Sequence, residues 1–403
     1  MKKALTALIV AFCALLSLCV GASADESAEV YPYTFAFEEF WYEDAVALED
    51  TLPCKAALLM EADSGRVLFA QNETAKLPIA SVTKIMSTLL VMEAIDSGKI
   101  RLTDMVTVGE EAAHMGGSQV YLEVGEQMPV SDMLKALVVV SANDATVAMA
   151  EHLAGSQSSF VSQMNARAAE LGMSETHFAN CHGLNEEGHY SCARDVAIMT
   201  RELLKHPLIL EYTQIWMDTI RNGAFGLANT NKLIRFYNGA NGMKTGFTDT
   251  AKYCLSGTAK RDGMQLIAVI IGADTSEIRF ASAKKLLDFG FANYAVKTPE
   301  RIELEPVTVN GGKAPQLAVT YDPPAILTEK GGKAPTQRAE LPESVDAPVK
   351  KGDTVGRVVF YIGETEVAQV PVYATEDAER NSFTKTAVSG QIQCAPAHCV
   401  PTC

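Results

Sequence analysis

The segment LPIASVTKIMSTLLVMEAI, residues 77–95, combines a helical pattern with a serine and a lysine three positions apart. Its apolar residues recur at helical spacing, and they predict a helix of roughly 18 residues that follows Ser81 and ends near Gly98. Positions i and i+3 share one face of a helix, so the Ser81 hydroxyl and the Lys84 amine can touch. The segment is therefore either a helix cap followed by a solvated cation, or a nucleophile beside its base.

The catalytic interpretation of this pair has a physical basis. A serine hydroxyl needs a base within hydrogen-bond reach to become a useful nucleophile. A lysine can be that base when burial or a neighbouring cation lowers its pKa, and Val82, Ile85 and Met86 provide apolar surroundings. Backbone N–H groups near the start of a helix could also hold an oxyanion. Because Ser-x-x-Lys recurs often by chance, other segments have to decide between the two interpretations.

Two further polar segments favour catalysis. Ser141-Ala142-Asn143 interrupts a very apolar helical region, and a polar trio there predicts a loop that faces a cleft. Lys244-Thr245-Gly246 lies inside a predicted strand. Gly246 weakens a strand interior unless the backbone of a ligand approaches closely. Lys244 offers a cation for a carboxylate and can lower the pKa of Lys84.

The order of the predicted elements indicates an α+β domain over residues 51–295. Two apolar runs around Asp63-Ser64-Gly65 predict a hairpin. Further helices are expected over 160–173, 193–206 and 276–294, and strands over 241–248 and 252–273, the last turning at 261–263. Strands at both ends with helices between them predict an antiparallel sheet flanked by helices.

The sequence pattern changes after Thr298 and again near both ends of the chain. Short alternating runs separated by turn residues predict a small all-β sandwich domain over residues 296–374. Residues 375–403 lack periodicity and are expected to be disordered. At the other end, residues 1–24 have a basic start, an apolar run and Ala22-Ser23-Ala24, the pattern of a cleaved export signal. Residues 25–50 form an acidic, aromatic-rich leader that docks either on the folded domain or on a partner, and we expect the first.

Charge and cysteine content exclude some classes of partner. The formal net charge is −15, which argues against a broad phosphate-binding surface and therefore against nucleic acid as a partner. Cys181, Cys192 and Cys254 lie in contexts that favour buried free thiols. The spacing of the C-terminal cysteines and histidine matches no zinc pattern, so no metal site is predicted.

The three motifs S-x-x-K, S-x-N and K-T-G occur here in the order and spacing that resemble the penicillin-recognising serine acyltransferases. Further segments narrow the resemblance, among them MNARAAELGMSETHF, CHGLNEEGHYSCARD and GDTVGRVVFYIGETEVAQVPVYA. These segments resemble the low-molecular-mass D-alanyl-D-alanine carboxypeptidases of the S11 serine peptidase family. The resemblance covers about residues 50 to 374 and implies a β-lactamase/transpeptidase-like catalytic domain followed by the small β domain.

The resemblance implies a role for each residue of the first two motifs. Ser81 would attack the carbonyl of a D-Ala-D-Ala peptide bond and form an acyl-enzyme, and Lys84 would take the hydroxyl proton. Ser141 would relay protons toward the leaving D-alanine. Asn143 would bind the substrate amide and help to orient Lys84. Water would then release the shortened peptide, so the reaction requires neither a metal nor an organic cofactor.

The resemblance also implies a set of substrate-binding residues around the third motif. Lys244 and Thr245 would hold the terminal carboxylate of the substrate. Gly246 belongs to the same strand, and the backbone N–H of Phe247 would complete an oxyanion hole with that of Ser81. Arg279 would contact the carboxylate end of the ligand, although a surface arginine on a helix is an equally simple interpretation.

One loop departs from the pattern of the family. His182 and Asn185 fall on the loop that resembles the one lining the deacylation side of the site. Here Cys181 stands where many relatives have proline, and Asn185 stands where some have aspartate. These departures favour a structural role over a catalytic one for this loop, and a structural role is also expected for His189.

Two other functions remain open from the sequence. A β-lactamase-type hydrolase would need a Glu-x-x-Leu-Asn pattern, which fails here because Asn180 follows Glu175 by five positions with THFA between. A catalytically silent penicillin-binding wall protein would keep the fold without turnover, although every motif residue is present. The expected partners are peptidoglycan stem peptides, and β-lactam antibiotics as acylating inhibitors.

The expected location is the cell envelope, outside the cytoplasm. Relatives usually end in an apolar or amphipathic segment that holds them to the membrane. Residues 375–403 contain neither a 20-residue apolar run nor a strong amphipathic stripe, so no C-terminal anchor is evident and membrane attachment stays open.

Overall fold

The computed structural model of the chain describes residue 48 and residues 51–381. The expected signal segment, all of the leader except residue 48, and the C-terminal cysteines lie outside the described residues. The disorder expected after residue 374 does not extend to residues 375–381, because Ala378 pairs with Val349 and Arg380 pairs with Gly312.

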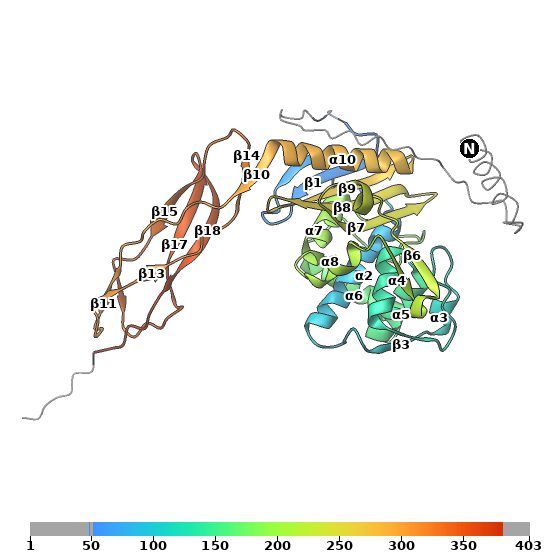
Figure 1. The fold of residues 1–403 in the computed structure, drawn as a ribbon, viewed down its shortest axis with the longest axis horizontal. Coiled ribbons are helices and arrows are strands. Elements are labelled where there is room, and N and C mark those ends of the chain that lie inside the picture. The colour runs from blue at the N-terminus through green and yellow to red at the C-terminus, as the bar shows by residue number, and fades with distance from the viewer. Residues whose placement is uncertain (1–47, 49–50, 382–403) are drawn as a thin grey trace, which may run out of the picture. The chain divides into compact units, whose positions relative to one another are not determined.

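A five-stranded sheet forms the centre of the α+β region (Figure 1). Its strand order is β2-β1-β9-β8-β7, and all neighbouring strands are antiparallel, as predicted. The strands are β1 (Ala56–Glu61), β2 (Val67–Gln71), β7 (Ala240–Thr248), β8 (Lys252–Arg261) and β9 (Met264–Ala273). The sheet places β7, which carries the Lys-Thr-Gly motif, at one edge.

Both predicted hairpin turns are present in this sheet. The Glu61 carboxylate accepts the backbone N–H groups of Asp63 and Ser64 and so closes the turn between β1 and β2. Asp262 and Gly263, with φ of +48° and +83°, form the two-residue turn between β8 and β9. A hairpin turn with positive φ at both central residues favours the pair Asp-Gly, which explains why the sequence predicted it.

Helices pack against both faces of the sheet (Figure 1). Helix α10 covers one face, where Leu286 belongs to the same apolar cluster as Leu59 of β1. The remaining large helices lie on the other face, where Leu58 of β1 belongs to their core. Successive side chains of a strand point to opposite faces, so β1 joins the two cores.

The bounds of these helices and of the short strands between them are as follows. The helices are the 3₁₀ turns η1 (Ala80–Thr83) and η2 (Arg221–Gly223), α2 (Lys84–Asp96), α3 (Glu110–Ala113), α4 (Val130–Val139), α5 (Asn143–Ala154), α6 (Gln157–Glu170), α7 (Ala193–Leu203), α8 (Leu208–Thr213), α9 (Leu233–Phe236) and α10 (Ser276–Asn293). The short strands pair as β3 (Met105–Thr107) with β4 (Gln127–Pro129) and β5 (Met217–Ile220) with β6 (Phe225–Ala228).

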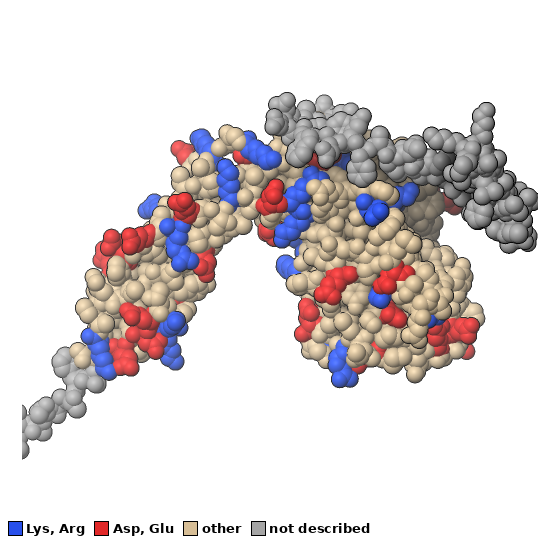
Figure 2. Space-filling model, in the orientation of Figure 1, with Lys and Arg blue, Asp and Glu red and all other residues tan. Residues whose placement is uncertain are grey.

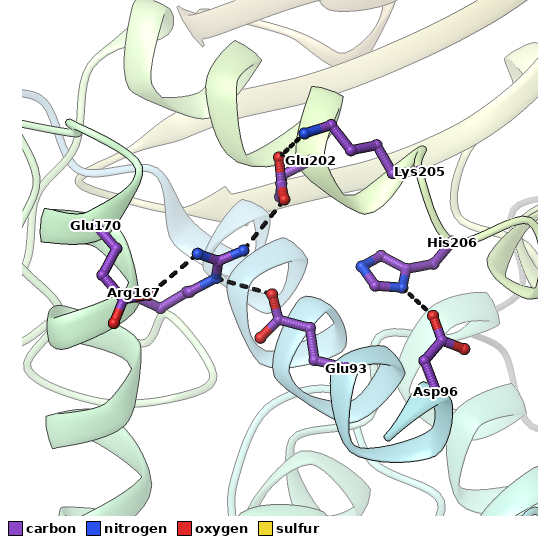
Figure 3. Close-up of polar contacts among 7 residues, drawn as sticks. All are labelled: Glu93, Asp96, Arg167, Glu170, Glu202, Lys205 and His206. Carbon is purple, nitrogen blue, oxygen red and sulfur yellow. Dashed lines mark hydrogen bonds and ion pairs between the residues drawn. The ribbon is translucent and has the colours of Figure 1, made fainter. Parts of the chain in front are cut away.

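Ion pairs hold the C-terminal half of α2 against its neighbours (Figure 3). Arg167 of α6 donates to Glu93 of α2 at 2.8 Å and to Glu202 of α7 at 3.1 Å. His206, after α7, pairs with Asp96 at the end of α2. One guanidinium thus bridges three helices, and it fixes the helix whose first residue is Lys84.

The chain after α10 forms the predicted all-β domain. Its strands make a three-stranded sheet, β12-β11-β16, and a four-stranded sheet, β13-β18-β17-β15, while β10 pairs with β14. Apolar clusters around Val309 and around Phe360 form its cores. The strands are β10 (Tyr294–Lys297), β11 (Val307–Asn310), β12 (Gln316–Leu317), β13 (Val319–Thr320), β14 (Ile326–Glu329), β15 (Thr336–Glu340), β16 (Ser344–Asp346), β17 (Thr354–Ile362) and β18 (Thr365–Ala374).

The surface carries mixed charge. On the face drawn in Figure 2, lysine and arginine side chains are interspersed with aspartate and glutamate. Within residues 51–381, no helix has both the length and the apolar character needed to cross a membrane. Cys181, Cys192 and Cys254 are buried free thiols, as predicted.

Candidate active site

Ser81 and Lys84 lie together where η1 passes into α2. The Lys84 Nζ is 3.0 Å from the Ser81 Oγ, as the spacing of three residues predicted. The Lys84 side chain is fully buried, whereas Ser81 is half-buried. The hypothesis of a solvated cation is therefore wrong, because the apolar residues of α2 and its neighbours enclose the amine.

Lys84 has two further hydrogen-bond partners. Its Nζ lies 2.6 Å from Asn143 Oδ1 and 2.8 Å from the backbone carbonyl of His182. Burial lowers the pKa of Lys84 to about 7, against an opposing effect of the Asp144 carboxylate. A neutral amine has two N–H donors and one lone pair. Because the amide oxygen and the carbonyl can only accept, the lone pair is left for the Ser81 hydroxyl.

Ser141 and Asn143 occupy the connection between α4 and α5, as the polar trio predicted. Ser141 has a φ of +65°, which is rare for a residue with a side chain. Its hydroxyl is buried and has no hydrogen-bond partner among the described residues. Backbone strain and an unsatisfied buried polar group are both uncommon, and they concentrate at functional sites.

Asp144 organises the wall of the site next to Asn143, and no sequence motif pointed to it. Its buried carboxylate accepts the backbone N–H groups of Val120 and Leu122. Asn143 itself donates to the carbonyl of Gly116 at 2.7 Å. The start of α5 therefore fixes the loop of residues 116–122, which is hereafter called the wall loop.

Lys244 and Thr245 of β7 form a buried part of the site. Burial lowers the pKa of Lys244 well below its usual value, and the charges of Lys84 and Arg279 lower it further. Burial is the cause that lowers the pKa of Lys84, so the expected effect of Lys244 on Lys84 stays a prediction. The Thr245 hydroxyl donates to the Thr230 hydroxyl at 2.7 Å.

Gly246 makes a close contact within the protein that the sequence did not predict. A Cβ at this position would lie 2.7 Å from the carbonyl oxygen of Ile79 and 3.0 Å from the backbone nitrogen of Ser81. The turn that carries Ser81 thus requires glycine here, and the approach of a ligand backbone to Gly246 stays a prediction. Glycine lets β7 lie directly against that turn.

Arg279 and Phe247 flank this contact. Arg279 lies on α10 and is only 6% exposed, so the interpretation as a surface arginine is wrong. Its guanidinium donates to the carbonyls of Gly246 and Cys254, which are neutral, and burial lowers its pKa to about 10. Phe247 follows on β7, and its half-exposed ring lies 4.4 Å from that of Tyr253.

The loop around His182 supports the site through its backbone, in line with the expected structural role. A Cβ at Gly183, where φ is +89°, would lie 2.0 Å from the carbonyl oxygen of Ala80. His189 accepts the N–H of Ala179 at Nδ1, so its Nε2 donates to the Thr83 hydroxyl at 2.7 Å. Burial lowers the pKa of His189 to about 4, which keeps the ring neutral.

The structure thus brings most of the nine expected residues into one connected group. Ser81, Lys84 and Asn143 are joined by hydrogen bonds. The backbone of Ser81 adjoins Gly246 of β7. The same strand also carries Lys244, Thr245 and Phe247. Arg279 donates to the Gly246 carbonyl. Ser141 lies two residues before Asn143 and makes no direct hydrogen bond to the group.

Two family profiles match consecutive parts of the chain. The D-alanyl-D-alanine carboxypeptidase profile matches residues 44–275, and the penicillin-binding protein 5 C-terminal domain matches residues 300–380. The chain is 43% identical over 359 residues to D-alanyl-D-alanine carboxypeptidase DacF of Bacillus subtilis (strain 168), which covers 87% of this chain and 92% of that protein. It is 34% identical to DacC of Escherichia coli (strain K12), over 89% of this chain and 92% of that protein.

Solved structures of penicillin-binding proteins are also similar to this chain. Penicillin-binding protein 5 from Haemophilus influenzae superposes with a TM-score of 0.71 at 31% identity, covering 83% of this chain and 100% of that one. Penicillin-binding protein D2 from Listeria monocytogenes, in its ampicillin-bound form, gives 0.55 at 34% identity over 60% of this chain and 98% of that one. Fold and site define a serine peptidase of the penicillin-recognising class. The chain belongs to the D-alanyl-D-alanine carboxypeptidase family.

Proposed function

We propose that this protein removes the terminal D-alanine from peptidoglycan stem peptides through an acyl-enzyme on Ser81. The observation that carries this proposal is the hydrogen-bond set of Lys84. Its two other partners accept only, and its pKa is lowered to about 7, so a neutral amine directs its lone pair at the Ser81 hydroxyl. That is the arrangement that general-base activation of a serine requires.

Acylation would proceed in two bond changes. The Ser81 oxygen attacks the carbonyl carbon of the D-Ala-D-Ala bond while Lys84 takes the hydroxyl proton. The carbon–nitrogen bond then breaks, and the leaving amine of D-alanine receives a proton through Ser141, whose buried hydroxyl is available for this transfer. The backbone N–H groups of Ser81 and Phe247 would hold the oxyanion, consistent with the close packing of β7 on η1.

Selection of a free carboxylate at the end of the peptide would depend on β7. Lys244, Thr245 and Arg279 supply two cations and a hydroxyl at the same part of this strand. An approaching carboxylate would raise the pKa of Lys244 again, because an opposite charge favours the protonated amine. Asn143 would contact the substrate amide while its side-chain oxygen keeps Lys84 in place.

Water would complete the cycle by hydrolysing the ester between Ser81 and the shortened peptide. One oxygen–carbon bond breaks, Ser81 recovers its proton, and the peptide leaves with a new carboxylate. A β-lactam would acylate Ser81 in the same way and leave it slowly, so penicillins are expected to act as inhibitors. Glu175, the glutamate closest in sequence to a β-lactamase pattern, instead pairs with Lys76.

The substrate implies a location outside the cytoplasm. Peptidoglycan stem peptides lie in the cell envelope, and the export pattern of residues 1–24 agrees with delivery there. Export would be tested by fractionating cells and by determining the N-terminus of the mature protein, which should lie near Asp25. A protein recovered in the cytoplasm with residues 1–24 attached would contradict this part of the proposal.

The activity itself is tested by two parallel assays on the purified protein. We expect D-alanine release from a peptide that ends in D-Ala-D-Ala and only slow turnover of a chromogenic cephalosporin, with both reactions lost in Ser81→Ala. Rapid cephalosporin turnover without D-alanine release would indicate a β-lactamase. A protein that neither releases D-alanine nor reacts with labelled penicillin would be catalytically silent.

A further inference from the structure

An exposed aromatic side chain is held beside the site in an unfavourable backbone conformation. Tyr121, in the wall loop, is 67% exposed and has a φ of +57°. A residue with a bulky side chain rarely adopts this conformation, and it persists only where the surroundings enforce it. The flanking N–H groups of Val120 and Leu122 are fixed by the buried Asp144 carboxylate, so the enforcing contacts are present.

Arg221 fixes the same loop from the opposite side. Its guanidinium donates to the backbone carbonyls of Val120 at 2.7 Å and Tyr121 at 3.1 Å. It also forms two hydrogen bonds with the Glu126 carboxylate, at 2.8 and 3.0 Å. A guanidinium has five N–H groups, and these contacts use four of them. The loop is therefore rigid while the Tyr121 ring stays open to solvent.

The ring of Tyr121 belongs to a larger open pocket. The ring of Phe225, on β6, lies 6.3 Å from it, and Arg221 lies over the Phe225 ring. The pocket has a volume of about 570 Å³ and is lined by Tyr121, Glu123, Val124, Gly125, Glu126 and Arg221. This set of residues is hereafter called the Tyr121 pocket. Its volume is in the range that holds a ligand of two or three rings.

The Tyr121 pocket is connected to the catalytic residues. The wall loop begins at Gly116, whose carbonyl accepts from Asn143, and the Asn143 N–H donates to the Ser118 carbonyl at 2.7 Å. Asn143 in turn contacts Lys84. The wall loop thus links Tyr121, through Asn143, to the Lys84 amine.

We propose that the Tyr121 pocket binds a sugar ring of the glycan strand to which the stem peptide is attached. A pyranose has one face of C–H groups that lies flat on an aromatic ring, and hydroxyl and acetamido groups around its edge. The exposed Tyr121 ring supplies the flat surface, and the Phe225 ring, tilted by 60° to it and covered by Arg221, packs beside it. The Glu126–Arg221 pair supplies acceptors and one unused N–H at its edge.

An apolar partner fits this pocket less well. The Glu126–Arg221 ion pair and Glu123 border the Tyr121 ring, and an apolar surface would remove water from these polar groups without offering them hydrogen bonds in return. A sugar ring can cover the aromatic ring with its C–H face and form hydrogen bonds with the charged groups at the edge of the pocket. The inference rests on the proposed function, and it adds that the enzyme prefers stem peptides still attached to glycan over free peptides.

The test compares one pentapeptide with and without its N-acetylglucosamine–N-acetylmuramic acid disaccharide. The measured quantity is kcat/KM for the disaccharide-linked pentapeptide divided by kcat/KM for the free pentapeptide. It is determined for the wild type and three variants. Tyr121→Asn removes the ring at a position where asparagine tolerates positive φ better than tyrosine does, so the fold should be kept. Tyr121→Phe keeps the ring, and Tyr373→Asn alters a tyrosine of similar chemistry in β18.

The expected result is a ratio about five- to tenfold lower in Tyr121→Asn, with Tyr121→Phe and Tyr373→Asn within twofold of the wild type. An unchanged ratio in Tyr121→Asn would overturn the inference, including the case in which both substrates lose activity equally because the ring contacts the peptide. The melting temperature checks that each variant is folded.

A second arm keeps the inference testable if the proposed function fails. Should the wild type release D-alanine from neither substrate, a peptide-free glycan tetrasaccharide is titrated into the wild type and Tyr121→Asn by calorimetry. Binding that is weakened about five- to tenfold by Tyr121→Asn would support the sugar site without the activity. Absence of binding, or equal binding to both proteins, would overturn it.

Discussion

At the residue scale, the chemistry depends on what surrounds the Lys84 amine. The Lys84 amine has three hydrogen-bonding positions, and they are taken up by Ser81, Asn143 and the His182 carbonyl. A buried lysine with two neutral acceptors and a hydroxyl is less costly as a neutral amine than as a cation. Burial of this amine costs free energy on folding, and the same burial prepares Lys84 to accept a proton.

This environment predicts the pH dependence of acylation. The pKa of Lys84 is lowered to about 7 in the folded protein, and only the neutral amine can accept the Ser81 proton. The rate constant for acylation by a fluorescent penicillin should therefore be low at pH 5 and rise through a midpoint near pH 7 to a plateau. Stopped-flow measurement from pH 5 to pH 9 checks it. A midpoint near 10, the ordinary value for lysine, would contradict the account.

Gly246→Ala should damage the site without touching a catalytic side chain. The new Cβ would meet the Ile79 carbonyl oxygen at 2.7 Å, so β7 or the turn that carries Ser81 has to move. We expect acylation to slow at least tenfold, with a loss of about 1–3 kcal/mol in the free energy of unfolding.

Gly226→Ala on β6 is the matched control for this variant, because a Cβ there meets no atom of the described residues within 4 Å. It should acylate at nearly the wild-type rate. Comparable acylation by Gly246→Ala and Gly226→Ala would show that β7 need not lie against Ser81 for the reaction.

The sequence predicted the side chains of the site better than its backbone. The roles of Ser81, Lys84 and Asn143 could be predicted, because residue type and spacing can be read directly from the sequence. The His182 carbonyl could not be found, since every residue has one and only the fold aims this one at Lys84. The glycine at position 246 is unusual in a strand, but the contact with the Ser81 turn could not be predicted, because local pattern does not say which distant backbone approaches a strand.

At the element scale, α2 is the part of the fold on which the site depends. It begins at Lys84, and contacts with α6 and α7 fix its other half through Arg167 (Figure 3). The long periodic helices and the hairpins were predicted from the sequence. The four-residue strands β5 and β6 and the helices α8 and α9 were not, because such short elements depend on tertiary contacts more than on periodicity.

Removing the Arg167 guanidinium should loosen the packing around α2. Arg167→Met keeps the apolar stem and leaves the half-buried Glu93 without its guanidinium partner, while Glu202 keeps only its pair with Lys205. We expect the free energy of unfolding to fall by roughly 1–3 kcal/mol in urea denaturation, with activity at 25 °C nearly kept. Arg357→Met, which breaks an exposed pair with Glu340, serves as the control and should cause a much smaller change.

At the scale of the whole molecule, two kinds of sequence information led to the same family. Alternating and helical patterns predicted the α+β region and the all-β domain, and both are present. Three short motifs separated by 60 and about 100 residues predicted one site, because an antiparallel sheet and its helices can return distant segments to one place. The leader of residues 25–50 carries no such motif, and its role stays a prediction.

Mass spectrometry after reaction with a penicillin tests whether Ser81 is the nucleophile. Trypsin cleaves after Lys76 and Lys84, so the peptide of residues 77–84 contains Ser81 together with Thr83. The account predicts one penicilloyl group per protein, located on Ser81 by fragmentation of that peptide and missing in Ser81→Ala. An adduct located on Ser141, or one retained in Ser81→Ala, would contradict it.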